Sequence, residues 1–435
     1  MKGLEFWGIE HGGAAAARSC QVSSRRIRSS QARLKTTPDA TGNQIFKSCR
    51  EVRRAKRWNR VTLRAQVPVL VSAMAEETIQ QAERKPRVFH ALGTAVPSAP
   101  AGVPDDPALP GLALLHRPEQ FLAAFTPLLR NRLGSRIELT HGRLFVHRYV
   151  PGKRCIVKVE ATMRTAPGMP DEPQCFFVKL YTGGHGARVY KNCQQVWRLG
   201  FSQGRFTIAE PLAYHPAWQA LILGCEEGPS LREIVLAGQA APRAVEGAAK
   251  WLHRLHTCGF EGGREYSLSR HLHILGAQQS RLASAQREAG RIFGDILDGM
   301  KHRILKLEPL RLAPTHRDFS PEHVTMEGDR FTGLDFDEFC QYHPLFDVAH
   351  FVAHLRFLAL TSLGSINALD DLATHFEDSY ASESADFSVS RLHLFAAIAY
   401  LKLAYVEAAV RHNRDGKQVT DALLEEAGRF AESEN

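Results

Sequence analysis

Acidic side chains between residues 316 and 347 are the part of this chain best suited to chemistry. Asp318 and Asp335 stand 17 positions apart, and each borders a short apolar segment. Asp347 follows a further 12 positions on. Carboxylates on neighbouring loops of a hairpin-like unit can converge on one bound cation, because hard cations prefer oxygen ligands. The spacing therefore indicates a site for a metal-bound anion.

Two groups of elements must position these acids. Upstream, segments 144–150, 155–161 and 174–181 are rich in β-branched and aromatic residues and are separated by turn residues. This pattern predicts three successive antiparallel strands. A helix is expected over 188–199, followed by further strand character up to residue 223. The upstream part is therefore predicted to be a small antiparallel sheet carrying one helix.

Downstream of residue 228 the chain is predicted to be helical almost to its end, apart from an irregular interlude that carries the acids. We expect an α+β, two-lobed architecture, with a small antiparallel β lobe over 136–227 and a larger, mainly helical lobe over 228–435. The expected helices are 245–257, 268–305, 346–360, 366–380, 389–412 and 419–430, and the interlude is 313–344.

The positive charge of the chain belongs to its first segment. Residues 1–73 hold 15 Lys or Arg against 4 acids, so they carry +11, while the whole chain carries +9 and the remainder −2. Residues 1–75 show no hydrophobic period, which predicts a disordered basic extension of doubtful origin. In this interpretation Met74 is a plausible start of the protein proper. An organelle transit peptide is the alternative for the same Arg-rich, acid-poor segment. Residues 76–135 are expected to be a linker with short helices, one near 118–131.

Three further features limit the function classes. A basic extension supports only weak attraction to polyanions, so we expect no specific nucleic-acid partner. The eight cysteines show no Cys-x-x-Cys spacing, which argues against a zinc site and a disulfide framework and favours a cytoplasmic protein. The apolar segment 392–410 is interrupted by His393, Lys402 and Glu407, which favours a core helix and no membrane partner.

The motifs around the acids resemble those of a known family. His316-Arg-Asp-Phe-Ser-Pro-Glu-His-Val is followed by Gly333-Leu-Asp-Phe-Asp and then by Pro344-Leu-Phe-Asp-Val-Ala. In this order the motifs resemble the aminoglycoside phosphotransferase and choline kinase family, which has the protein-kinase-like fold. The resemblance covers residues 136–412. It implies an ATP-dependent phosphotransferase that moves the γ-phosphoryl group to a hydroxyl of a small molecule.

The resemblance implies a role for each candidate residue. Phosphoryl transfer needs an oriented acceptor hydroxyl, a cation on the triphosphate and a clamp on the nucleotide. Asp318 suits the first task, since a loop carboxylate can orient the hydroxyl and accept its proton. Asp335 suits a magnesium ion, which one or two carboxylates and phosphate oxygens usually hold. Lys179, on the last strand before the helix, is preferred to Lys158 for pairing with the ATP phosphates.

Two departures from the family pattern affect the expected activity. His323 stands where the family has Asn; neutral imidazole binds magnesium poorly, so His323 is expected to hydrogen-bond through the site or to favour Mn²⁺ as a metal ligand. Residues 188–199 contain no acid to pair with the strand lysine, only Gln194 and Gln195. A catalytically impaired, pseudokinase-like nucleotide-binding protein is therefore the alternative.

Nucleotide contacts beyond the lysine are predicted in two places. Backbone amides near Gly152, helped by Lys153 or Arg154, are candidates to cover the phosphates. An ordinary hairpin turn fits the same residues equally well. Segment 221–227 is expected to be the hinge between the lobes, whose backbone groups hydrogen-bond to adenine.

The acceptor is expected to be a small molecule, because Asp335 and Asp347 leave no room for the long segment by which protein kinases dock a peptide. Residues 360–435 hold 13 acids against 6 bases, which suits a cationic acceptor such as an aminoglycoside or an amino alcohol. Arg317 replaces the Gly typical of aminoglycoside kinases and favours a sugar or another metabolite instead. The sequence predicts neither the acceptor nor the oligomeric state.

Overall fold

The computed structural model describes most of the chain beyond the basic extension. The described residues are 87–92, 105–134, 136–165, 170–226, 228–307, 310–411 and 416–433. They all belong to one unit of the chain, Val67–Asn435. The expected extension over residues 1–75 lies outside the described residues.

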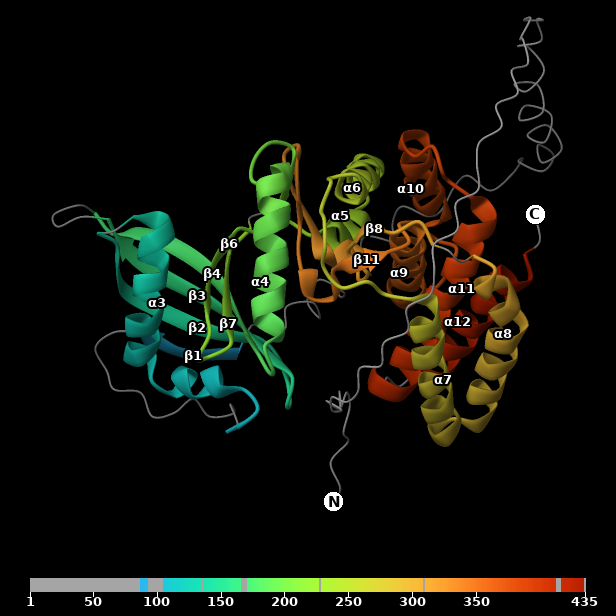
Figure 1. The fold of residues 1–435 in the computed structure, drawn as a ribbon, viewed down its shortest axis with the longest axis horizontal. Coiled ribbons are helices and arrows are strands. Elements are labelled where there is room, and N and C mark those ends of the chain that lie inside the picture. The colour runs from blue at the N-terminus through green and yellow to red at the C-terminus, as the bar shows by residue number, and fades with distance from the viewer. Residues whose placement is uncertain are drawn as a thin grey trace, which may run out of the picture. The chain divides into compact units, whose positions relative to one another are not determined.

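A six-stranded antiparallel sheet forms the first lobe (Figure 1), with the strand order β1-β2-β3-β4-β7-β6. Strands β2, β3 and β4 are the three that the sequence predicts. Strand β1 lies inside the expected linker, and its pairing with β2 shows how tertiary context can decide strand formation. The strands are β1 Arg87–Leu92, β2 Glu138–Val150, β3 Arg154–Arg164, β4 Glu172–Tyr181, β6 Pro211–His215 and β7 Ala220–Gly224.

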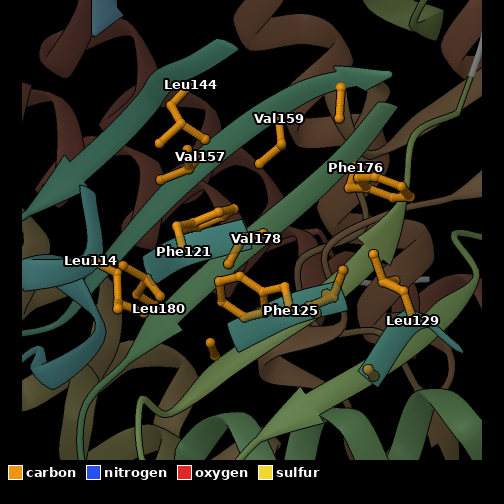
Figure 2. Close-up of a cluster of buried hydrophobic side chains, with 14 of the residues drawn as sticks. Leu114, Phe121, Phe125, Leu129, Leu144, Val157, Val159, Phe176, Val178 and Leu180 are labelled. Carbon is orange, nitrogen blue, oxygen red and sulfur yellow. The ribbon is translucent and has the colours of Figure 1, made fainter. Parts of the chain in front are cut away.

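Helix α3 (Pro118–Leu133) packs against one face of this sheet. Figure 2 shows Phe121 and Phe125 of α3 beside Val178 and Leu180 of β4 in one cluster of buried apolar side chains. Because successive side chains of a strand point to opposite faces, the alternate residues of β4 point away from α3. The face away from α3 is therefore available for polar side chains.

Helix α4 (His185–Val196) contacts β4, β6 and β7 and corresponds to the helix expected over 188–199. It contains no acid, as its sequence shows. Cys193 of α4 is buried, and Gln195 donates to the carbonyl of Glu261 in the second lobe. The helix therefore has no carboxylate to offer a strand lysine.

The second lobe is mainly helical, as predicted. The expected helix 268–305 is two helices, because Gln286 adopts an extended conformation with φ −142°. Short helix α5, which begins with a capping box at Ser230, is not apparent in the sequence pattern. The helices are α5 Leu231–Ala237, α6 Ala241–His256, α7 Leu268–Ala285, α8 Arg287–Leu305, α9 Leu345–Leu363, α10 Asp370–Glu383, α11 Val389–Val406 and α12 Gly416–Glu432.

The interlude between α8 and α9 is more regular than expected. Its strands take part in two small sheets: β9 and β10 pair with each other and β10 with β5, which comes from before α5, and β8 pairs with β11. Backbone pairing across residues distant in sequence orders this segment, which has little local strand signal. The strands are β5 Phe206–Ile208, β8 Ala313–Thr315, β9 Val324–Glu327, β10 Arg330–Gly333 and β11 Cys340–Tyr342.

Two glycines fix β10 against α6. A Cβ at Gly247 would lie 2.0 Å from the ring of Phe331, and a Cβ at Gly333 would lie 2.1 Å from the ring of Trp251. Real Cβ contacts are not that short, so both positions require glycine for the close approach of the two elements. Asp335 follows Gly333 by two residues, so this packing also fixes where the Asp335 loop begins.

One disulfide corrects the expectation that the cysteines form none. Cys175 of β4 and Cys225, directly after β7, are bonded, with their Cα atoms 5.2 Å apart. The two strands are paired in register, which brings these cysteines together although 50 positions separate them. Cys155, Cys193, Cys258 and Cys340 are free among the described cysteines.

One described helical segment, Val389–Val410, is long and apolar enough to cross a membrane by length and composition alone. Inside this structure 72% of its most apolar window is buried. Helix α11, which makes up most of it, packs against α9 and α12. This packing agrees with the expected core helix.

Candidate active site

Acidic and basic side chains from both lobes form a cluster beside β4. Nζ of Lys179 donates to Oδ1 of Asp335 at 2.7 Å and to Oδ1 of Asp337 at 3.1 Å. The hydroxyl of Tyr181 donates to Oδ1 of Asp337 at 2.6 Å, and Nη1 of Arg154 donates to its other oxygen. Arg154 and Tyr181 are direct cross-strand partners. Two strands therefore converge on two loop carboxylates.

The charges of this cluster stabilise one another. Burial alone would raise the pKa of Asp335, but Lys179, His323 and Arg154 outweigh it and hold that pKa below its usual range. Burial alone would lower the pKa of Lys179, but Asp337 and Asp335 outweigh it and raise that pKa. Lys179 and Asp335 are therefore both ionised at neutral pH. The side chains of Lys179 and Asp337 are each only 7% exposed, so solvent screens this pair weakly.

Asp318 lies in a second cluster made by the loop between β8 and β9, α9 and α11. Its Oδ1 accepts from Nζ of Lys402 at 3.1 Å and lies 3.6 Å from Nε2 of His350. Burial would raise the pKa of Asp318, but Lys402, His323 and His350 hold it well below its usual range. Because its pKa is low, the carboxylate is ionised at neutral pH. Its side chain is 35% exposed, so it is also accessible to a ligand.

His323 lies between the two clusters. Its Nδ1 donates to the backbone carbonyl of Asp318 at 2.6 Å, because a carbonyl oxygen can only accept. Nε2 of the same ring lies 3.8 Å from Oδ2 of Asp335, so a cation bound to that nitrogen would also lie beside a carboxylate. His323 thus makes the hydrogen bond through the site that the sequence predicts.

The donor set suits a cation shared with a ligand better than one held by protein alone. Among the described residues, no group of three or more His, Cys, Asp or Glu side chains could hold a metal ion. Magnesium is typically bound by one or two carboxylates plus phosphate oxygens; Asp335 supplies one such carboxylate, whereas the His323 nitrogen suits a softer divalent cation such as Mn²⁺. These two residues would therefore hold a divalent cation only together with phosphate.

Asp347 does not join the other acids, which corrects the expectation that three carboxylates converge. It is fully buried and accepts from the backbone N–H groups of His316 and Arg317, both at 2.7 Å. It also contacts Nε2 of His256 at 3.1 Å. These bonds hold the loop immediately before Asp318. Arg317 and Asp335 both adopt positive φ, which is uncommon for residues with a Cβ and frequent at functional sites.

The turn between β2 and β3 reaches the site through Arg154, one of the residues named from the sequence, and not through the Gly152 amide. The amide of Gly152 donates to Oδ2 of Asp106 at 2.7 Å, so this amide is engaged by a carboxylate. Lys153 is partly buried, and its pKa is lowered by burial and by the neighbouring Arg154 and Arg281. It is Arg154 that reaches the paired aspartates of the site.

Asp337, Lys402 and His350 had no role assigned from the sequence. Asp337 stands two positions after Asp335, and its position suggests no partner. Lys402 lies 84 positions after Asp318 in an otherwise apolar helix. The local signals are a lysine in an apolar helix and, at His350, a histidine four positions before another histidine.

A strand lysine and two loop aspartates that meet between an antiparallel β lobe and a helical lobe define a protein-kinase-like phosphotransferase. The model of the phosphotransferase enzyme family, APH, matches residues 170–382. The matched segment includes Lys179, Asp318 and Asp335. No curated protein matches the sequence.

Several solved structures are distantly similar. A choline/ethanolamine kinase family protein from Mesorhizobium loti is 15% identical, with a TM-score of 0.43 over 67% of this chain and 88% of that one. A Plasmodium vivax ethanolamine kinase is 12% identical, with a TM-score of 0.44 over 85% and 95%. A spectinomycin phosphotransferase in complex with ADP and spectinomycin is 12% identical, with a TM-score of 0.46 over 72% and 97%.

Proposed function

We propose that this protein transfers the γ-phosphoryl group of ATP to a hydroxyl group of a small molecule. The observation that carries the proposal is the contact of Lys179 with Asp335, on a loop that His323 connects to Asp318. Three groups are thereby adjacent. Lys179 is the cation for the nucleotide phosphates, Asp335 is the carboxylate for a metal ion, and Asp318 is the carboxylate for the acceptor. These are the three groups that phosphoryl transfer requires.

Asp318 would orient the acceptor hydroxyl. A carboxylate whose pKa is held low by Lys402 is a weak proton acceptor, so it accepts a hydrogen bond before it accepts a proton. Phosphoryl transfer tolerates this, because its transition state is largely dissociative and needs little activation of the nucleophile. The proton would move to Asp318 late, as the hydroxyl oxygen gains its bond to phosphorus.

Lys179 and Arg154 would bind the phosphates from the β lobe. Helix α4 offers no acid to hold Lys179, and Asp337 takes this place by accepting from Lys179, Arg154 and Tyr181. With Asp337 as the anchor, Asp335 can exchange its contact with Lys179 for a metal ion. This arrangement supports an active enzyme in spite of the missing helix acid.

Asp335 and His323 would hold a divalent cation together with the phosphates. The cation would neutralise charge on the triphosphate and on the leaving group. Nε2 of His323 suits Mn²⁺ better than Mg²⁺, because imidazole is a softer ligand than an amide oxygen. We therefore expect activity with either ion and a preference for Mn²⁺.

The test is ADP formation from ATP, with water or a hydroxyl compound as acceptor, in the wild type and in Asp318→Asn. We expect wild-type turnover and its loss in the variant, with ATP binding retained in both. If ATP binds and neither protein forms ADP with Mg²⁺ or Mn²⁺, the protein is the impaired nucleotide-binding alternative. The nucleotide titration separates that outcome from a misfolded preparation.

A further inference from the structure

The ammonium group of Lys402 lies where an acceptor must approach Asp318. It is 29% exposed, and it comes from α11, far from the motifs that define the family. We propose that the acceptor is a small anionic hydroxyl compound whose negative group binds Lys402 while its hydroxyl meets Asp318. This inference rests on the proposed function and adds the class of acceptor to it.

The hydrogen bonds of Lys402 leave one donor for a ligand. Nδ1 of His350 donates to the carbonyl of Phe319 at 3.0 Å, so Nε2 of that ring carries the lone pair. Lys402 donates to this Nε2 and to Oδ1 of Asp318, each at 3.1 Å. An ammonium group has three N–H donors. Among the described residues no third partner of Lys402 is seen, so one N–H is available beside the base.

Basic side chains surround Asp318 and disfavour a cationic acceptor. Those that act on the carboxylate most strongly are Lys402, His323, His350 and His354. A substrate amine beside Asp318 would also lie beside the ammonium of Lys402, and like charges in close contact repel. A carboxylate or phosphate group would gain a charge-assisted hydrogen bond at the same place.

A cavity of about 130 Å³ lies on the other side of His354 and is not lined by Asp318 or Lys402. A water molecule occupies about 30 Å³ in the liquid and drug-sized ligands need about 300 Å³ or more, so the cavity suits a compound of a few heavy atoms. Its one acidic side chain, Glu322, lies 3.5 Å from Arg232 and is paired with it. The lining residues are Arg232, Pro321, Glu322, His354, Phe357, Leu358 and Thr361.

Two histidine rings lie between the cavity and Asp318. The rings of His354 and His350 are 4.3 Å apart, and His350 contacts both Lys402 and the Asp318 carboxylate. The class of acceptor is therefore inferred from the contacts of Lys402 with Asp318, and the cavity adds a basic side chain, His354, near them.

The acids of residues 360–435 do not supply a cation site at Asp318. Asp370 pairs with Arg356 at 2.8 Å, and Asp421 pairs with Lys417 at 2.7 Å. Other acids of this region are likewise paired with arginines, among them Asp386 and Glu426. These four acids are therefore engaged by other bases, two of which, Arg356 and Arg311, lie outside the region.

The experiment uses four three-carbon probes that differ in one substituent: glycerol, glycerate, glycerol 3-phosphate and 3-aminopropane-1,2-diol. Binding of each to the full chain with ADP present is measured by calorimetry, and ADP formation from ATP is measured in parallel. The variants are Lys402→Met and Lys402→Arg. The matched control is Lys417→Met, whose lysine is 81% exposed and lies outside the site.

We expect glycerate or glycerol 3-phosphate to bind at least tenfold more tightly than glycerol, and the aminodiol to bind most weakly. Lys402→Met should abolish this preference, Lys402→Arg should restore most of it, and Lys417→Met should leave it unchanged. Equal binding of all four probes, no binding of either anion, or a preference that survives in Lys402→Met would overturn the inference. Binding is measured by calorimetry and does not require turnover. If the proposed kinase activity fails but the inference holds, the anions still bind preferentially while no ADP forms.

Discussion

Lys179 and Asp335 are joined across the two lobes, with Nζ and Oδ1 2.7 Å apart. The rival lysine, Lys158, is paired instead with Glu160 on its own strand at 2.9 Å. Lys179 therefore contacts the candidate site, whereas Lys158 is paired on the surface of the sheet.

This difference gives a matched pair of variants. Lys179→Met should raise the KM for ATP and lower kcat, with a loss of about 10- to 100-fold in kcat/KM, the usual value of a charge-assisted contact. Lys158→Met should leave both constants within twofold. Steady-state kinetics on the two variants measures this, and equal losses would show that Lys179 has no special contact with the nucleotide.

Asp337 should act as the anchor of the lysine. It accepts from Lys179, Tyr181 and Arg154 while nearly buried, so Asp337→Ala leaves two cations without their shared anion. Breaking a buried ion pair typically costs about 3–5 kcal/mol, and we expect a loss near 3 because Lys179 keeps Asp335. Urea unfolding measures the free energy of unfolding. Glu338→Gln, at a half-exposed acid next in the chain, is the control and should change it little.

His323 should set the metal preference. Replacing it with Asn supplies an amide oxygen, which is a harder ligand than an imidazole nitrogen. We expect His323→Asn to raise the ratio of Mg²⁺-supported to Mn²⁺-supported turnover about tenfold. Initial rates in the two ions give this ratio directly. An unchanged ratio would mean that His323 does not contact the cation.

His343 should make the fold sensitive to acid. It is 3% exposed, Nδ1 accepts from the backbone N–H of Leu345 at 3.2 Å, and burial lowers its pKa to about 4 from 6.5. Between these pH values the unfolded chain binds the proton and the folded chain does not. The free energy of unfolding should therefore fall as pH falls from 6.5 to 4, by about 3 kcal/mol in full.

The measurement is denaturant unfolding at pH 7 and pH 4.5. His343→Gln should show a smaller fall than the wild type, whereas His273→Gln, at an exposed histidine, should match the wild type. A wild-type stability that is flat over this range would contradict the assignment.

The sequence predicted the site residues that lie in short local motifs, but it did not predict the contacts between segments that are distant in the chain. Asp318, Asp335 and Lys179 could be predicted because their spacing and order are carried by short segments. Asp337 as anchor and Lys402 as partner of Asp318 could not, since each depends on elements that are distant in sequence and meet only after folding. The Cys175–Cys225 bond was missed for the same reason, because strand pairing has no signal in cysteine spacing.

The strand order shows the same limit. Strands β2 to β4 have turn signals at their ends and were predicted. Strands β8 to β11 are three or four residues long and depend on partners in other segments, so their sequence resembles a loop. Tertiary pairing, which no local pattern records, orders the segment that carries both aspartates.

The most direct test of the central claim is phosphoryl transfer from γ-labelled ATP, measured alongside ATP binding in the wild type and in Asp318→Asn. The account predicts label transfer to an acceptor or to water in the wild type. It predicts a loss of at least 100-fold in the variant, with the Kd for ATP changed less than threefold. Wild-type rates that persist in Asp318→Asn would contradict it, because the reaction would then not use the carboxylate around which this site is built.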